Sequence, residues 1–134
     1  MRLTGTVSHD GETITVADPD HRIDTIDVRF PAALGVAAHA DVASPRVEAN
    51  WFSAALLKAT DGGPDRQEGQ LPVLITTSWW DGDTHRIDRG IYDIAWQTNG
   101  RLLRGRALRL EALVLRERGG SAKRLDVLWR TPAR

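Results

Sequence analysis

A short acidic run near the middle of the chain carries side chains that could hold a metal ion. Three carboxylates and one imidazole fall within eight residues: Asp81, Asp83, His85 and Asp88. Carboxylate oxygens and neutral imidazole are common ligands of divalent cations. The run begins with Asp-x-Asp, as a calcium loop does, but its twelfth position is Tyr92 rather than a glutamate. Because turn carboxylates that cap backbone N–H groups explain the same pattern, we expect no metal and rank the four as weak candidates.

The chain shows no motif of a catalytic centre. It has no cysteine, which excludes thiol nucleophiles, disulfides and cysteine-ligated zinc. No serine lies in a Gly-x-Ser-x-Gly turn, and the sequence lacks both the phosphate-binding loop and the dinucleotide-binding glycine pattern. We therefore assign no catalytic residue and no cofactor. A role other than catalysis is favoured, although carboxylates far apart in the sequence can meet in space.

One tryptophan is expected to face outward. In the alternating run 71–80, Trp79 shares a face with the apolar residues, which sends Trp80 to the opposite face. An outward tryptophan can anchor a protein interface or stack on a ligand. The alternative is a second buried face that a helix or a neighbouring subunit covers. The residues that we assign to binding are Trp80, Arg104, Arg106 and Arg109.

The charges of this electrically neutral chain are separated along the sequence. Residues 1–100 hold 8 basic and 15 acidic side chains, a net of −7, whereas residues 101–134 hold 10 basic and 3 acidic ones, a net of +7. Either the basic third folds against the acidic part, or it meets an acidic surface on another copy. A basic face with exposed aromatics also suits nucleic acid, but the isoelectric point near 6.9 and the absence of a recognition motif make that partner a minority hypothesis.

The first half of the chain alternates in short runs. Leu3 to Val7, Thr13 to Ala17 and Thr25 to Phe30 are separated by polar turns, which predicts a three-strand meander. In segment 45–59, Ser44-Pro45 is typical of a helix start and Asp61-Gly62-Gly63 of a stop, so we expect a helix there. The alternation of Val47, Ala49 and Trp51 supports a strand as the alternative.

The second half of the chain is predicted to form β-hairpins. Strands are expected over 71–80 and 92–96, and Asn99-Gly100 is a strong hairpin turn. Segment 107–118 suits a strand or a helix. We favour the strand, because a turn at Gly119-Gly120-Ser121 would pair it with an alternating run over 125–129. A shift in the apolar face near Gly105 indicates a bulge or bend.

Taken together, the sequence predicts one domain over residues 1–134, α+β and β-rich. We expect an antiparallel rolled sheet or β-barrel of about seven strands with one helical segment, or an all-β sandwich if 45–59 is a strand. The favoured function is a non-catalytic binding or assembly protein, such as a repeated structural component of a larger multi-subunit particle. The alternatives are a small-molecule-binding β-barrel or barrel enzyme, and a nucleic-acid-binding module. Self-association or another protein is the expected partner.

The sequence also favours a soluble protein. Its longest apolar runs fall well short of the roughly 20 residues that cross a bilayer, and its first residues lack the apolar core of a signal peptide. We therefore expect no membrane span and a location inside the cell or in a particle assembled there.

Overall fold

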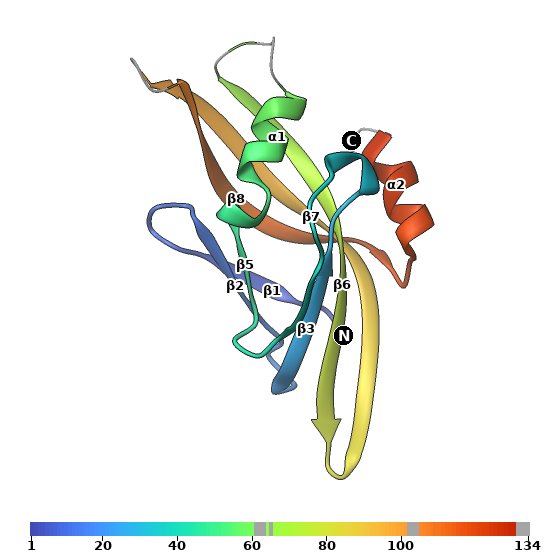
Figure 1. Cartoon of the computed structure of the whole chain (residues 1–134). Helices are drawn as coiled ribbons and strands as arrows, with labels where there is room; N and C mark the ends of the chain where they lie inside the picture. The colour runs from blue at the N-terminus through green and yellow to red at the C-terminus, as the bar shows by residue number, and fades with distance from the viewer. Residues whose placement is uncertain (61–63, 65, 102–104, 131–134) are drawn as a thin grey trace.

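The computed structural model describes residues 1–60, 64, 66–101 and 105–130 (Figure 1). These residues form eight strands, two α-helices and two 3₁₀ turns. The strands are β1 (Thr4–Val7), β2 (Thr13–Ala17), β3 (Ile23–Arg29), β4 (His39–Val42), β5 (Arg46–Glu48), β6 (Gln67–Asp81), β7 (Thr84–Arg101) and β8 (Gly105–Arg118). The helices are α1 (Ser53–Ala59) and α2 (Ala122–Arg130), and the 3₁₀ turns are η1 (Ala32–Leu34) and η2 (Ala49–Trp51).

The strands make two antiparallel sheets. The large sheet has the order β4-β3-β6-β7-β8, and the small sheet has the order β1-β2-β5. The centre of the large sheet is the β6–β7 hairpin, which pairs without interruption from Gln67 opposite Thr98 to Asp81 opposite Thr84. Gly82 makes its turn with a φ of 62°, a left-handed conformation that glycine adopts without steric cost.

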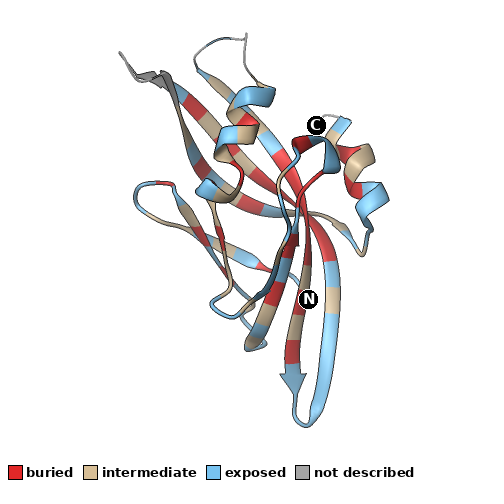
Figure 2. Ribbon diagram, viewed as in Figure 1, coloured by how far each residue is buried: buried red, intermediate tan, exposed pale blue. Residues whose placement is uncertain are grey.

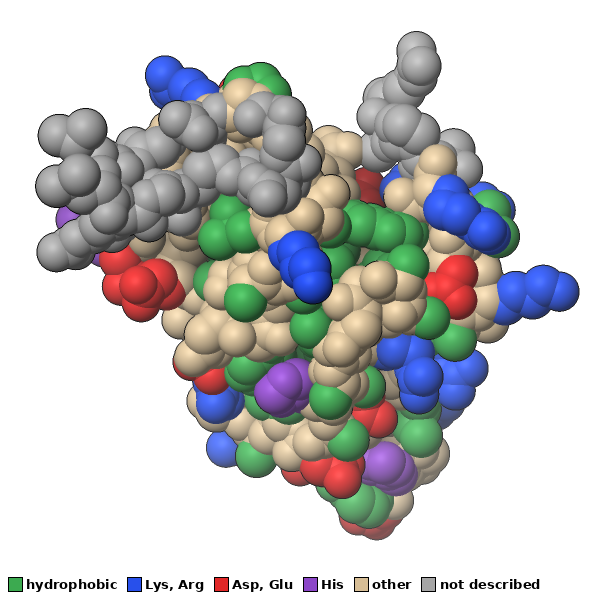
Figure 3. Space-filling view, turned by 45° about the horizontal axis from the view of Figure 1, so that its top comes forward, with side chains coloured by type: hydrophobic (Ala, Val, Ile, Leu, Met, Phe, Trp, Pro, Cys, Tyr) green, Lys and Arg blue, Asp and Glu red, His purple; other side chains and the backbone are tan. Residues whose placement is uncertain are grey.

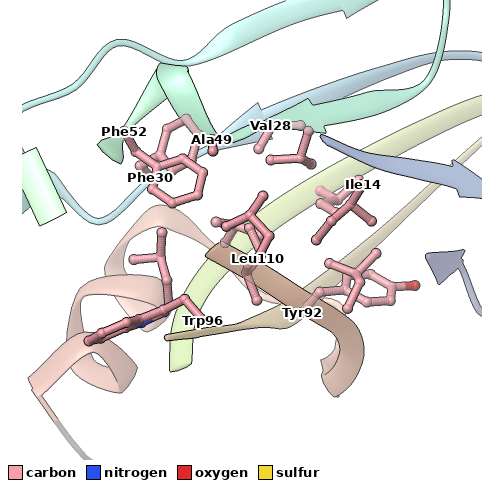
Figure 4. Packing of buried hydrophobic residues seen from close by; sticks show 14 of the residues in the cluster. Ile14, Val28, Phe30, Ala49, Phe52, Tyr92, Trp96 and Leu110 are labelled. Carbon is pink, nitrogen blue, oxygen red and sulfur yellow. The ribbon is translucent and has the colours of Figure 1, made fainter. Parts of the chain in front are cut away.

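One apolar cluster fills the space between the two sheets. We call the side of the large sheet that faces the small sheet the inner face. Its buried side chains include Val28, Tyr92 and Leu110, which pack against Ile14 of the small sheet (Figure 4). Phe52, which precedes α1, closes one end of this cluster against Phe30, with ring centroids 5.4 Å apart. Burial of so many large side chains accounts for the association of the sheets.

The opposite side of the large sheet, the outer face, is covered over part of its length by α2. Leu125 and Leu128 of the helix are buried against Leu74 and Ile91 of the sheet in a second apolar cluster. The hydroxyl of Ser121 accepts a hydrogen bond from the backbone N–H of Arg124 (3.1 Å) and so caps the first turn. The rest of the outer face, along β3, β6 and β7 toward the hairpin turn, carries no helix (Figure 1).

Hydrogen bonds fix the N-terminal strands to the C-terminal half of the chain. The backbone N–H of Leu3 donates to the phenol oxygen of Tyr92 (3.1 Å). The guanidinium of Arg109 donates to the carbonyl of His9 (2.9 Å), and the N–H of Leu110 donates to the carbonyl of Gly11 (2.8 Å). The turn between β1 and β2 is therefore held against β8.

The structure confirms a β-rich, antiparallel fold with helical segments, and it corrects several expected elements. The described residues form eight strands, in keeping with the expected number of about seven, but two α-helices where one helical segment was expected. Residues 1–30 do not form one meander, because β2 pairs with β1 and β5 while β3 joins the other sheet. In 45–59 both alternatives are partly right, since β5 and η2 precede α1. The choice between barrel and sandwich stays a prediction.

Two expected hairpin features are wrong. Asn99 and Gly100 do not turn the chain but continue β7, where they pair with Ala107 and Arg106 of β8. Segment 125–129 is part of α2 and not a strand, because Leu125 and Leu128 lie on the same side of a helix and bury there. The register between β7 and β8 shifts at Ile91/Tyr92 and at Ala95/Trp96, and the predicted bulge or bend near Gly105 borders residues 102–104, which lie outside the described residues.

Candidate interface on the outer face of the large sheet

The β6–β7 hairpin projects beyond the body of the protein. Its turn end stands apart from the small sheet and both helices (Figure 1), and its surface is exposed there (Figure 2). Every residue from Trp80 to Ile87 is exposed. The outer face of this hairpin is therefore open beyond α2, whereas Thr77 and Trp79 on its inner face are buried.

Two large apolar side chains are exposed on the outer face of this projecting hairpin. Trp80 is 57% exposed and Ile87 is 63% exposed. Both point to the outer face, because Trp80 pairs with His85, Ser78 pairs with Ile87, and paired residues share a face. The His85 ring lies 4.8 Å from the Trp80 ring and supports it. The prediction that alternation turns Trp80 outward is confirmed.

A groove lies beside these side chains, where β3 pairs with β6. It encloses about 330 Å³ and is lined by three aspartates, Asp24, Asp27 and Asp41, with His85 and Ile87 on the other wall. We call it the acidic groove. Its floor is polar and ordered, because the hydroxyls of Thr25 and Ser78 are hydrogen-bonded at 2.8 Å and the N–H of Asp41 donates to Asp27 Oδ1 (2.8 Å).

A second cleft continues the groove toward α2. It encloses about 430 Å³, and the charged side chains in its lining include Arg29 and Arg89. We call it the basic cleft. Ser121 and Ala122, at the start of α2, form its far wall, and Asp27 and Thr76 line both depressions. The two therefore form one trough along the outer face, in which Asp27 of β3 and Arg89 of β7 lie on opposite sides of Thr76 of β6. Lys and Arg side chains gather on the α2 side of the molecule (Figure 3).

The four weak metal candidates are not assembled into one site. Asp81 binds the guanidinium of Arg86 (3.1 Å), and Asp88 faces the N-terminal amine of Met1 (3.6 Å). The His85 ring instead lies tilted against the Trp80 ring. Over the part of the chain that the structure describes, no group of three or more metal-ligating side chains converges.

The three arginines that were predicted to bind a partner lie in different environments or outside the described residues. Arg104 lies outside the described residues, and Arg106 belongs to β8, with a side chain that is likewise outside the description. Arg109 is held within the chain by its bond to His9. The basic third of the sequence is similarly engaged elsewhere, because Arg116 lies 3.4 Å from Asp93 and Arg124 binds Glu117. Much of the basic charge thus meets partners within the same molecule.

Two buried side chains have pKa values above their ordinary ones. Burial raises the pKa of the Tyr92 phenol above its ordinary value of 10.0, and the bond from Leu3 opposes that shift. Burial also raises the pKa of Asp93, against the opposing charge and hydrogen bond of Arg116. Neither group lines the trough.

A third cleft lies between the small sheet, α1 and β8. It encloses about 400 Å³ and is lined by polar side chains that include Glu12, Asn50 and Ser53. Glu48 also lines it, but Arg46 binds this carboxylate at 3.2 Å. The lining combines polar and apolar side chains. Among the described residues that line the cleft no nucleophile is paired with a base, so the cleft gives no catalytic assignment.

Comparisons with known proteins add no relative: no model of a protein family matches the chain, and no curated protein or solved structure does so either. None of the helices formed by the described residues has the length and apolar character to cross a bilayer.

Sequence reasoning found Trp80 but missed most of the trough. Asp24, Asp27 and Asp41 looked like ordinary turn and strand carboxylates, and Arg29 and Arg89 lie 60 residues apart. They come together only because β3 pairs with β6 across a separation of about 50 residues. A single signal was present in the sequence, namely that these charges alternate with apolar residues on their strands.

Proposed function

We propose that this chain is a non-catalytic assembly protein that associates with further copies of itself through the projecting β6–β7 hairpin. The observation that carries the proposal is the pair of exposed apolar side chains, Trp80 and Ile87, on one face of that hairpin. Scattered exposed apolar residues need no explanation, but here they border a trough that also carries charges of both signs. Such a combination suits a protein partner.

Burial of Trp80 and Ile87 in an interface would supply free energy of association. Complete burial of a large apolar side chain is worth about 1.5–3 kcal/mol. Aromatic anchors commonly dominate interfaces, with less apolar contacts around them that exclude water. Trp80 is the candidate anchor, and Ile87 extends the apolar contact. A repeated component of a larger particle, built from many copies, is the biological role that we favour.

The two other functions suggested by the sequence have weaker support. An apolar ligand cavity between the sheets would need free space, whereas buried side chains from both sheets pack there into one cluster. Nucleic acid would need a basic surface next to the exposed tryptophan, whereas Asp24, Asp27 and Asp41 line the neighbouring groove. Phosphate groups would be repelled at that end of the trough.

Sedimentation velocity over a concentration series tests the proposal with a matched pair of variants. Ile87 and Val114 are both β-branched and similarly exposed, at 63% and 58%, but Val114 lies on β8 next to β1, away from the hairpin. We expect the wild type to sediment as a species heavier than 14.8 kDa. Ile87→Ser should weaken association by about tenfold or more, since each 1.4 kcal/mol is a factor of ten.

The control, Val114→Ser, should leave association unchanged. Trp80→Ala should have the larger effect, since it removes the anchor. A wild type that remains monomeric at high protein concentration and low salt would contradict the proposal, as would equal effects of Ile87→Ser and Val114→Ser.

A further inference from the structure

We infer that the acidic groove of one copy, with the exposed Trp80 and Ile87 beside it, binds segment 101–106 of the next copy. This segment has the sequence Arg-Leu-Leu-Arg-Gly-Arg and joins β7 to β8. The inference rests on the proposed self-association and names the part of the second copy that fills the groove. The copies then follow one another head to tail.

The acidic groove holds carboxylates that lack a cation. Asp24, Asp27 and Asp41 line it, and within the described part of the chain none of the three forms an ion pair. Asp27 accepts a hydrogen bond from the N–H of Asp41, which neutralises neither side chain. A partner is therefore expected to bring positive charge, and guanidinium groups bind carboxylates in a favourable paired geometry.

The side chains next to these carboxylates require an apolar contact as well. Ile87 lines the groove, and Trp80 pairs with His85, which also lines it. Both apolar side chains are more than half exposed. A partner that buries them while it meets the aspartates must combine arginine or lysine with large apolar residues over a short length of chain.

Helix α2 limits the shape of the partner. It packs on Leu74 and Ile91 and covers the outer face beyond the groove, so a second sheet cannot lie flat along that face. The groove itself encloses about 330 Å³ and has no residue of α2 in its lining. A single narrow segment can enter it from the open end of the hairpin (Figure 2).

Segment 101–106 has the composition that the groove requires. It contains three arginines, two leucines and no acidic residue. Its residues 102–104 lie outside the described part of the chain. Other arginines of the basic C-terminal third bind groups of their own molecule, as Arg109 binds the carbonyl of His9 and Arg124 binds Glu117. The basic charge of segment 101–106 suits the groove because arginine binds carboxylates in two parallel hydrogen bonds.

The two surfaces lie at opposite ends of one long strand. Arg101 ends β7, and Ile87 lies near its start, 14 residues earlier. At about 3.3 Å per residue they are roughly 45 Å apart along the strand, so the segment does not reach the groove of its own copy (Figure 1). The contact must join different copies. Because each copy offers one groove and one segment, the contact is heterologous and builds an open chain or a ring.

Two double variants separate the halves of this contact. Asp24→Asn/Ile87→Ser changes the groove and keeps the segment, whereas Leu103→Ser/Arg104→Ser changes the segment and keeps the groove. Each change should weaken association by about tenfold or more. In sedimentation velocity, each variant alone should therefore be a monomer of 14.8 kDa at concentrations where the wild type forms larger species.

An equimolar mixture of the two variants provides the decisive measurement. The intact segment of the groove variant should bind the intact groove of the segment variant, and neither copy then offers a further contact. The mixture should therefore form a 1:1 dimer that does not grow as the concentration rises. The wild type, which keeps both halves, should grow beyond a dimer.

Val114→Ser/Lys123→Ser is the matched control. It also removes one exposed apolar and one exposed basic side chain, but both lie outside the groove and outside segment 101–106. This variant should associate as the wild type does. A loss of association equal to that of the groove and segment variants would overturn the inference.

The mixing experiment also separates this inference from the proposed function. A mixture that stays monomeric, or a segment variant that associates like the wild type, would overturn the inference. If the groove variant alone is then monomeric, assembly through the hairpin stands and another surface of the second copy fills the groove. A wild type that is monomeric would refute both.

Discussion

Substitution of Gly11 tests how the N-terminal hairpin is held against β8. Gly11 has a φ of +73° in the turn between β1 and β2. A Cβ atom added there would lie only 2.3 Å from Cγ of Arg109. This Cγ atom is close to the β8 backbone and so cannot move away freely. Gly35 has the same φ of +73°, but a Cβ atom there would meet nothing within 4 Å. Gly11→Ala and Gly35→Ala therefore differ in the contact with Arg109 and share the backbone conformation.

The expected losses in the free energy of unfolding follow from the left-handed backbone conformation and from the contact with Arg109. A left-handed alanine costs about 1–2 kcal/mol, partly offset by a gain of about 0.4–1 kcal/mol from the less flexible unfolded chain. We therefore expect Gly35→Ala to lower the free energy of unfolding by about 1 kcal/mol. Gly11→Ala adds the cost of overpacking, about 1–3 kcal/mol, for a total of about 2–4 kcal/mol.

Urea denaturation, followed by tryptophan fluorescence, measures both variants. With a denaturant slope of about 1–3 kcal/mol/M, the midpoint for Gly11→Ala should lie about 1 M below that for Gly35→Ala. In the double variant Gly11→Ala/Arg109→Ala the clash is gone, so its destabilisation should be smaller than the sum of the single effects. Equal midpoints for the two alanine variants, or strict additivity in the double variant, would refute the assigned contact.

Further predictions concern the buried titratable groups and the core. Tyr92 is the chain's one tyrosine, so absorbance of tyrosinate should report a midpoint above 10.0. Because the folded pKa is raised, its contribution to stability is present below pH 10 and is lost as the pH rises through that raised value; Tyr92→Phe should flatten this loss. The pKa of Asp93, already raised above 3.8, should rise further in Arg116→Gln, as carboxyl carbon chemical shifts would show. Leu110→Ala should lower the free energy of unfolding by about 2–5 kcal/mol in urea denaturation, since Leu110 is fully buried.

The sequence was most informative where alternation continued over many residues. The runs 71–80 and 92–96 are strands, and Trp80 faces outward as their period of two requires. Their true lengths were underestimated, because pairing with neighbouring strands extends β6 back to Gln67 and β7 forward to Arg101. Local pattern identifies such a strand, while its ends depend on partners that are distant in the sequence.

Elements that tertiary contacts decide were predicted less well. Asn99-Gly100 has the composition of a hairpin turn, yet β8 offers a continuous partner and the strand runs on. In segment 122–130, Leu125 and Val127 fit a strand while Leu125 and Leu128 fit a helix, and the docking site formed by Leu74 and Ile91 selects the helix. Ser121, which caps this helix, was the overlooked local signal.

The candidate interface had little signal in the sequence for the same reason. The acidic groove depends on the register of β3 against β6, in which Thr25 pairs with Ser78. Charge separation along the chain was visible and suggested a basic C-terminal surface. In the structure, Arg109 and Arg124 bind the chain's own groups, and the basic residues that line the trough are Arg29 and Arg89 from the acidic part of the sequence.

The contacts that fix the N-terminal strands have a consequence for synthesis on the ribosome. Leu3 is synthesised 89 residues before its partner Tyr92, and His9 is synthesised 100 residues before its partner Arg109. At about 5–20 residues per second, the first two strands emerge roughly 5–20 s before their partners do. During that interval Ile14 and Val16, which are buried in the finished protein, lack the part of their native cover that β7 and β8 provide. Nascent chains on neighbouring ribosomes are therefore expected to be most prone to mispairing through this N-terminal hairpin, and a chaperone that binds it early would act at the step where protection matters most.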